Sequence, residues 1–137
     1  MKLFGSVLLF LLYGFSFSPY HQDKVGYFIA GNTLAETEDK EWKQRQMTVM
    51  VDASDFTEER LRQLAEELLK KYPEPDNLSI SLKSHIDQLP FCIGERYHNA
   101  FDKYPHGGIN RFRGNEFIRY AIPPSREWRT IVLKGKV

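Results

Sequence analysis

The sequence contains almost no cysteine. Cys92 is the single cysteine in 137 residues, so no disulfide can form within the chain and no Cys-x-x-Cys metal or redox motif is present. The sequence also lacks a His-Glu-x-x-His motif, a Walker lysine pattern and a Gly-x-Gly-x-x-Gly fingerprint. Zinc protease chemistry and nucleotide binding therefore have no support from sequence motifs.

Charge is missing from the first part of the chain after Lys2. Residues 3–17 are apolar or small and uncharged, and these fifteen positions would span roughly 22 Å as a helix, less than the ~30 Å hydrocarbon core of a bilayer. We therefore expect residues 1–18 to be a secretory signal peptide, cleaved after Ser16 or after Ser18. The alternative is an uncleaved segment that tethers the protein to a membrane. Export predicts a secreted or periplasmic protein.

Residues 19–137 have the length of one small domain, which can bury enough surface to fold without disulfides. Charge is unevenly distributed within it. Residues 19–102 contain ten Lys or Arg against sixteen Asp or Glu, whereas residues 103–137 contain eight against two. We therefore expect the two parts of the chain to attract each other, and the basic C-terminal part to be a candidate surface for an anionic ligand or a protein partner.

The most regular pattern covers residues 47–84. Apolar residues alternate over residues 47–51 and again over residues 78–82, as in half-buried strands. Between them, apolar residues recur at helical spacing over residues 58–72, with Thr57 as the N-cap. This pattern predicts two parallel strands joined by a right-handed helical crossover, with helices mainly on one face of the sheet. The expected class is α/β, or α+β, in a small two-layer sandwich.

Other segments are less regular. Residues 116–122 and 128–134 are β-rich and flank a Pro-Pro-Ser-Arg-Glu loop, which predicts a C-terminal β-hairpin. Residues 25–30 resemble a further strand, and residues 91–101 are expected to contain a short helix. We interpret residues 31–46 as a loop or a short exposed helix, residues 105–108 as a turn, and residues 107–115 as a glycine-rich loop.

Cys92 and His98 are the candidates for a thiol nucleophile and its base. The neighbours of Cys92, Phe91 and Ile93, are apolar. That setting favours the competing interpretation of an inert thiol packed in the core.

His85 and Asp87 form the closest approach to a metal-binding pair, because they follow the second predicted strand at i, i+2 spacing. Zinc requires three or four converging ligands, and neither His21 nor His106 stands at a recognisable ligand spacing. Isolated surface histidines explain the same residues, and no cofactor is expected.

Arg111 and Arg113 lie in a glycine-rich stretch whose backbone N–H groups and guanidinium groups suit an anion. More arginines and aromatic residues follow in residues 103–137, a composition typical of polyanion-binding surfaces. Export argues against nucleic acid as the polyanion. The sequence thus favours an exported, non-catalytic binding or structural module; the alternatives are a small extracytoplasmic hydrolase or metal-binding enzyme, and a membrane-tethered accessory protein.

Overall fold

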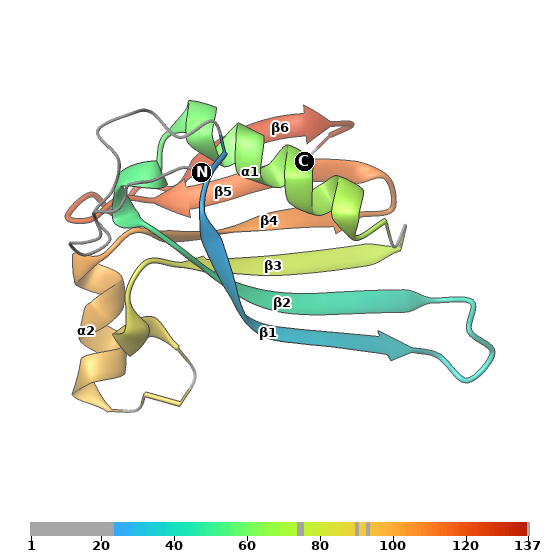
Figure 1. Ribbon diagram of the computed structural model, residues 1–137, viewed down its shortest axis with the longest axis horizontal. Coiled ribbons are helices and arrows are strands. Elements are labelled where there is room, and N and C mark those ends of the chain that lie inside the picture. The colour runs from blue at the N-terminus through green and yellow to red at the C-terminus, as the bar shows by residue number, and fades with distance from the viewer. Residues whose placement is uncertain (1–23, 74–75, 90, 93, 137) are drawn as a thin grey trace, which may run out of the picture.

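A computed structural model describes residues 24–73, 76–89, 91–92 and 94–136. They form a mixed α/β structure with one six-stranded sheet and two α-helices (Figure 1). The elements in chain order are β1 (Tyr27–Glu36), β2 (Lys43–Val51), the 3-10 turn η1 (Ala53–Asp55), α1 (Glu58–Lys71), β3 (Asn77–Lys83), the 3-10 turn η2 (Ile86–Gln88), α2 (Glu95–Lys103), β4 (His106–Phe112), β5 (Asn115–Ala121) and β6 (Arg129–Lys134). The predicted signal peptide, residues 1–18, lies outside the described residues.

The strands lie side by side in the order β1-β2-β3-β4-β5-β6. β2 and β3 are parallel, and α1 connects them, whereas every other neighbouring pair is antiparallel. The parallel pairing predicted for the strands that flank the helix is therefore confirmed. The predicted C-terminal hairpin is also confirmed, as β5 and β6.

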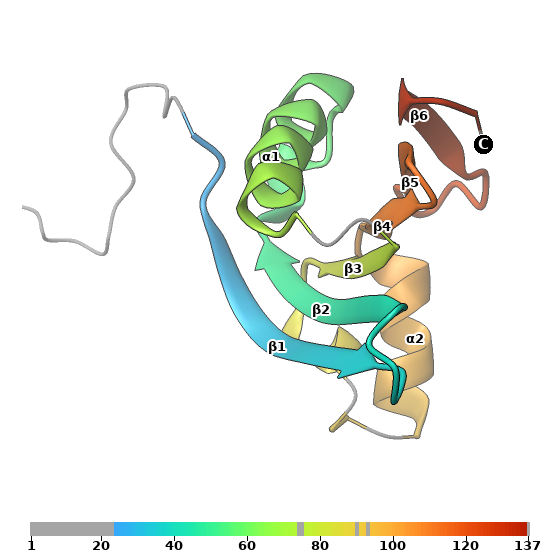
Figure 2. The same ribbon diagram turned by 90° about the vertical axis from the view of Figure 1, so that its right-hand side faces the viewer.

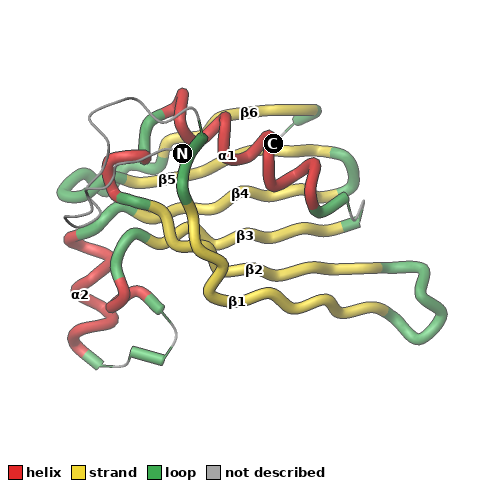
Figure 3. The backbone as a smooth tube through the Cα atoms, in the orientation of Figure 1, coloured by secondary structure: helices red, strands yellow, loops and turns green. Residues whose placement is uncertain are grey.

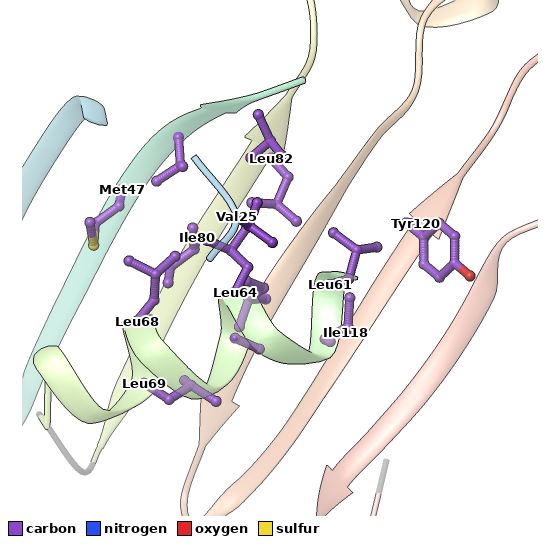
Figure 4. Packing of buried hydrophobic residues seen from close by; sticks show 14 of the residues in the cluster. Val25, Met47, Leu61, Leu64, Leu68, Leu69, Ile80, Leu82, Ile118 and Tyr120 are labelled. Atoms are coloured by element: carbon purple, nitrogen blue, oxygen red, sulfur yellow. The ribbon is translucent and has the colours of Figure 1, made fainter. Parts of the chain in front are cut away.

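Helix α1 forms where its cap and its apolar spacing place it. The Thr57 side chain accepts a hydrogen bond from the backbone N–H of Arg60 at 3.2 Å, which satisfies one of the N–H groups that the first turn leaves free. The apolar stripe of the helix is buried against the sheet, and Figure 4 shows its leucines pointing toward β2, β3 and β5. The buried stripe consists of Leu61, Leu64, Ala65, Leu68 and Leu69.

The prediction of a loop or exposed helix for residues 31–46 is wrong. β1 continues to Glu36 and β2 begins at Lys43, so that these residues form a β-hairpin (Figure 3). β1 is an edge strand and most of its side chains are exposed. Polar residues are tolerated there, and the alternation that identifies a half-buried strand is therefore absent from its sequence.

The predictions of a turn at residues 105–108 and of a glycine-rich loop at residues 107–115 are also wrong. β4 occupies residues 106–112, and only Arg113 and Gly114 form the turn to β5, both with positive φ (50° and 87°). Gly107 lies opposite Tyr120 on β5, and a Cβ at this position would overlap the Arg119 carbonyl oxygen. Gly107 therefore serves the close approach of two strands and not a flexible loop.

The sheet has two unlike faces. Figure 2 shows α1 over one face and α2 beside the other, so the expectation that helices lie mainly on one face is only partly met. The face under α1 carries the apolar core, including Met47, Ile80, Ile109 and Ile118. We call the opposite side the open face, because α2 contacts it only at the end where Lys83 and His106 lie.

Candidate ligand-binding site

Among the described residues, no hydrogen bond joins Cys92 to His98. The Cys92 thiol is partly exposed and donates a weak hydrogen bond to the Ile86 carbonyl oxygen at 3.4 Å. His98 is exposed on α2, where its ring contacts Tyr97 at 5.7 Å between centroids. Cys92 is not among the core residues, so the expectation of a thiol packed in the core is wrong.

His85 and Asp87 stabilise a turn and a helix. The His85 Nδ1 atom accepts a hydrogen bond from the Asp87 backbone N–H at 3.1 Å, and its ring stacks on Tyr104 at 4.0 Å. The Asp87 carboxylate binds Arg96 of α2 at 2.7 Å. Within the described part of the chain, no group of three or more His, Cys, Asp or Glu residues is arranged to hold a metal ion.

Arg111 is buried and belongs to the fold. Its guanidinium donates hydrogen bonds to the carbonyl oxygens of Leu69 and Tyr72, both at 2.7 Å, and to the Glu116 carboxylate at 2.8 Å. The last carbonyls of a helix have no partner within the helix. Arg111 therefore closes the C-terminal end of α1 against β4 and β5.

Arg113 has a different environment from Arg111. It is exposed in the β4–β5 turn, with its guanidinium 5.6 Å from the centre of the Trp42 ring and 5.2 Å from that of Phe112. The two arginines predicted to act together thus separate, and only Arg113 faces solvent. We call Trp42, Phe112 and Arg113 the distal cluster.

A larger group of cations and rings lies at the other end of the open face. The Lys83 ammonium is 4.6 Å from the centre of the Phe101 ring, and Phe101 contacts the His106 ring at 5.0 Å. His106 in turn contacts Trp128 at 5.3 Å, and the Arg119 guanidinium is 5.4 Å from the Trp128 ring. These five residues, which we call the basic-aromatic cluster, come from β3, α2, β4, β5 and the loop before β6.

Backbone register explains why these residues meet. Lys83 and His106 are direct cross-strand partners, and so are Gly108 and Arg119, so all of these positions face the same side of the sheet. Gly108 has no side chain and leaves room beside Arg119. The register therefore brings residues 83, 106 and 119 together from three strands.

A pocket of about 340 Å³ opens beside this cluster. It lies between α2 and the β5–β6 loop, and its walls include His106, Trp128, Arg126, Asp102 and the prolines of the loop. The Trp128 side chain is 48% exposed. A half-exposed indole adjacent to cationic groups thus lines the pocket.

The cations of the basic-aromatic cluster are not neutralised by nearby acids. Across the described residues, no carboxylate forms a salt bridge with Lys83, Arg119 or Arg126. Partial burial lowers the pKa of Lys83 below the ordinary lysine value, because the ammonium loses hydration without gaining a counter-charge. An anion placed here would supply that missing counter-charge.

A second, larger cavity is less suited to a charged ligand. It measures about 570 Å³ and lies between α1 and the β5–β6 edge, lined by Arg62, Glu66, Lys70, Arg111 and Glu116 among others. Both signs of charge occur on its walls, and Arg111 and Glu116 bind each other. The walls of the smaller pocket also include one acid, Asp102, beside Arg126. It adjoins Lys83 and Arg119, however, and neither forms a salt bridge in the described structure, so the smaller pocket is the stronger candidate.

Sequence reasoning identified the basic and aromatic character of residues 103–137 but not the site. The sequence alone assigns no role to Lys83 or Phe101, and it identifies His106 only as an isolated histidine. The one available signal was a lysine ending a strand whose other open-face residues, Asn77, Ser79 and Ser81, are small and uncharged. The contacts to α2 depend on register and helix placement, which a single sequence does not reveal.

Neither described helix has the length and apolar character needed to cross a membrane. Comparisons with protein-family models, curated proteins and solved structures gave no match. The chemistry of the basic-aromatic cluster is therefore the main indication of function.

Proposed function

We propose that this chain is an exported, non-catalytic binding module that holds an anionic ligand at the basic-aromatic cluster. The observation that carries the proposal is the set of cations around a half-exposed tryptophan with no carboxylate partner in the described structure. Charged groups normally have partners when they are partly buried. A bound anion is the simplest partner for the partly buried Lys83, and the exposed Arg119 adds a second cation beside Trp128.

The pocket supports a ligand that combines a negative group with a ring or other flat surface. Its volume of about 340 Å³ is within the usual range of small-molecule sites, at the lower end. Arginine suits a carboxylate because its guanidinium donates two parallel hydrogen bonds. Trp128 offers a flat apolar surface next to that charge, so a sugar acid or an aromatic acid fits the chemistry.

We also propose that the chain is exported and has the domain architecture predicted from its sequence. Removal of residues 1–18 at the membrane would leave a single domain of residues 19–137, secreted or periplasmic. The domain is then a two-layer sandwich in which β2, α1 and β3 form a right-handed crossover, the hand that such connections adopt in about 98% of cases. Retention of the N-terminal segment would instead make it a membrane-tethered accessory protein.

Replacing Arg119, which lies beside the Trp128 ring, together with Arg126 of the pocket wall should weaken anion binding strongly. In the full chain carrying Trp42→Phe, glucuronate should quench Trp128 fluorescence, and adding Arg119→Ala with Arg126→Ala should weaken binding at least tenfold. The reason is that each hydrogen bond to a charged group contributes about 1.5–3 kcal/mol, and 1.4 kcal/mol is a factor of ten.

The matched control is Arg62→Ala, an exposed arginine on α1 that pairs with Glu58. It removes a positive charge far from the cluster and should leave affinity unchanged. An equal loss of affinity in the control would mean that only overall charge matters. Absence of quenching by glucuronate at any concentration that leaves the protein folded would contradict the proposal.

The pH dependence of binding should reveal Lys83. An anion beside Lys83 raises its pKa, so binding is strongest while the ammonium is charged and weakens as pH rises through the depressed pKa of the free protein. Arginine stays charged across this range. The Lys83→Arg variant should therefore retain its affinity to higher pH than the parent.

The measurement is a series of glucuronate titrations above about pH 8, where an ordinary imidazole is neutral and an ordinary carboxylate is charged. Coincident pH profiles for the parent and for Lys83→Arg would show that Lys83 does not contact the ligand.

A further inference from the structure

We infer that the ligand is a linear acidic polysaccharide that crosses the open face of the sheet from the basic-aromatic cluster to the distal cluster. This inference rests on the proposed function, since it extends the same anion site. It adds the chemical class of the ligand, a second contact at the distal cluster, and the direction in which the ligand lies along the strands.

The open face is complementary in charge to a polyanion. In β1 to β5, the residues that pair across the strands in line with Gln46 and Thr48 have their side chains on the open face. None of these described residues is an Asp or a Glu. The face instead carries Lys83, His106 and Arg119. The acidic residues of the described strands, such as Glu116, are directed to the side of α1.

The middle of the open face offers hydrogen-bonding groups on β2 to β4, next to the aromatic Phe117 of β5, which is the cross-strand partner of Asn110. Within the described structure, no hydrogen bond engages the side chains of Gln46, Thr48, Ser79, Ser81 and Asn110, which lie on β2, β3 and β4. Short hydroxyl and amide groups both donate and accept. They suit the hydroxyl groups of sugar rings better than they suit an apolar protein surface.

The distal cluster repeats the chemistry of the basic-aromatic cluster at the other end of the strands. Arg113 lies over Trp42 and Phe112, and Phe112 is 44% exposed. From His106 to Phe112, β4 extends about 20 Å at ~3.4 Å per residue. The chain has two tryptophans, and one belongs to each cluster, so the two ends can be observed separately.

A polysaccharide accounts for these features better than nucleic acid does. Nucleic-acid-binding domains usually carry a strong excess of positive charge with a pI above about 9, whereas this chain has a net charge of +1 and a pI of about 7.8. The cations here are confined to the two ends of one face. An acidic polysaccharide offers carboxylates to these cations and hydroxyl groups to the uncharged polar side chains between the two ends, and so matches that layout.

The test titrates the full chain with oligogalacturonates of increasing length. Two variants report on the two ends: Trp42→Phe leaves only the fluorescence of Trp128, and Trp128→Phe leaves only that of Trp42. Galacturonate, the single unit of these oligomers, should quench only Trp128. Oligomers long enough to bridge the two clusters should quench both tryptophans and bind at least tenfold more tightly than the monosaccharide, because the second contact forms within the complex.

Arg113→Ala in the Trp42→Phe background should abolish the gain in affinity with length and leave monosaccharide binding intact. Monosaccharide binding without any gain with length would overturn this inference while the proposed function stands. No binding of either would overturn both. Tighter binding of oligothymidylate than of oligogalacturonate would overturn the inference and assign the open face to nucleic acid. Loss of oligogalacturonate binding when the chain self-associates would assign the face to a second copy of the chain.

Discussion

Replacing Arg111 with alanine is expected to lower the free energy of unfolding by about 3–5 kcal/mol, the usual cost of removing one member of a buried charged pair. The change would leave the Glu116 carboxylate without its partner. It would also leave the carbonyl oxygens of Leu69 and Tyr72 without the hydrogen bonds that close α1. Urea denaturation followed by circular dichroism measures this effect.

Arg113→Ala is the matched control for Arg111→Ala. It removes the same type of side chain two residues away, but from an exposed turn. Its effect should stay within about 0.5 kcal/mol, as for most surface substitutions. Similar stabilities for the two variants would show that Arg111 does not stabilise the end of α1 in the way described.

Leu68→Ala should also be strongly destabilising, by about 2–5 kcal/mol, because it leaves a cavity beneath α1. Leu68 is 0% exposed and packs in the core cluster. Glu66 lies on the exposed side of the same helix, and Glu66→Ala should cost little. Thermal unfolding of both variants decides the orientation of α1, and equal small effects would refute it.

The elements that sequence predicted well are those whose pattern is local. Helix α1 combines a cap and an apolar stripe, and a proline, Pro73, follows the residue that caps its end, so each signal lies in nearby residues. The strands beside it alternate because one face is buried. Their parallel pairing follows from the length of the helical connection, and the structure has both the helix and the pairing.

The elements that sequence missed depend on neighbours far along the chain. β1 has no alternation because it is an edge strand, and Gly107 resembles a loop residue until Tyr120 is seen opposite it. Arg111 and Arg113 look alike in sequence. One is buried because β4 passes the end of α1, and the other is exposed because it lies in the turn between β4 and β5.

The candidate site shows the same limit. The basic and aromatic composition of residues 103–137 indicated an anion-binding surface, but its strongest feature combines that segment with Lys83 from β3. Lys83 and His106 meet only because β3 and β4 pair in one particular register. A shift of one residue would have placed either side chain on the opposite face.

The most direct test of the account is a map of chemical shifts of the isotopically labelled full chain during titration with an oligogalacturonate. The account predicts that the largest changes occur at Lys83, Arg119 and the Trp128 indole N–H, and continue along β2 to β4 to Trp42. It also predicts no change along the exposed side of α1. Changes centred on the cavity between α1 and the β5–β6 edge, at Arg62 and Lys70, would contradict the account, and so would a spectrum that the ligand leaves unaltered.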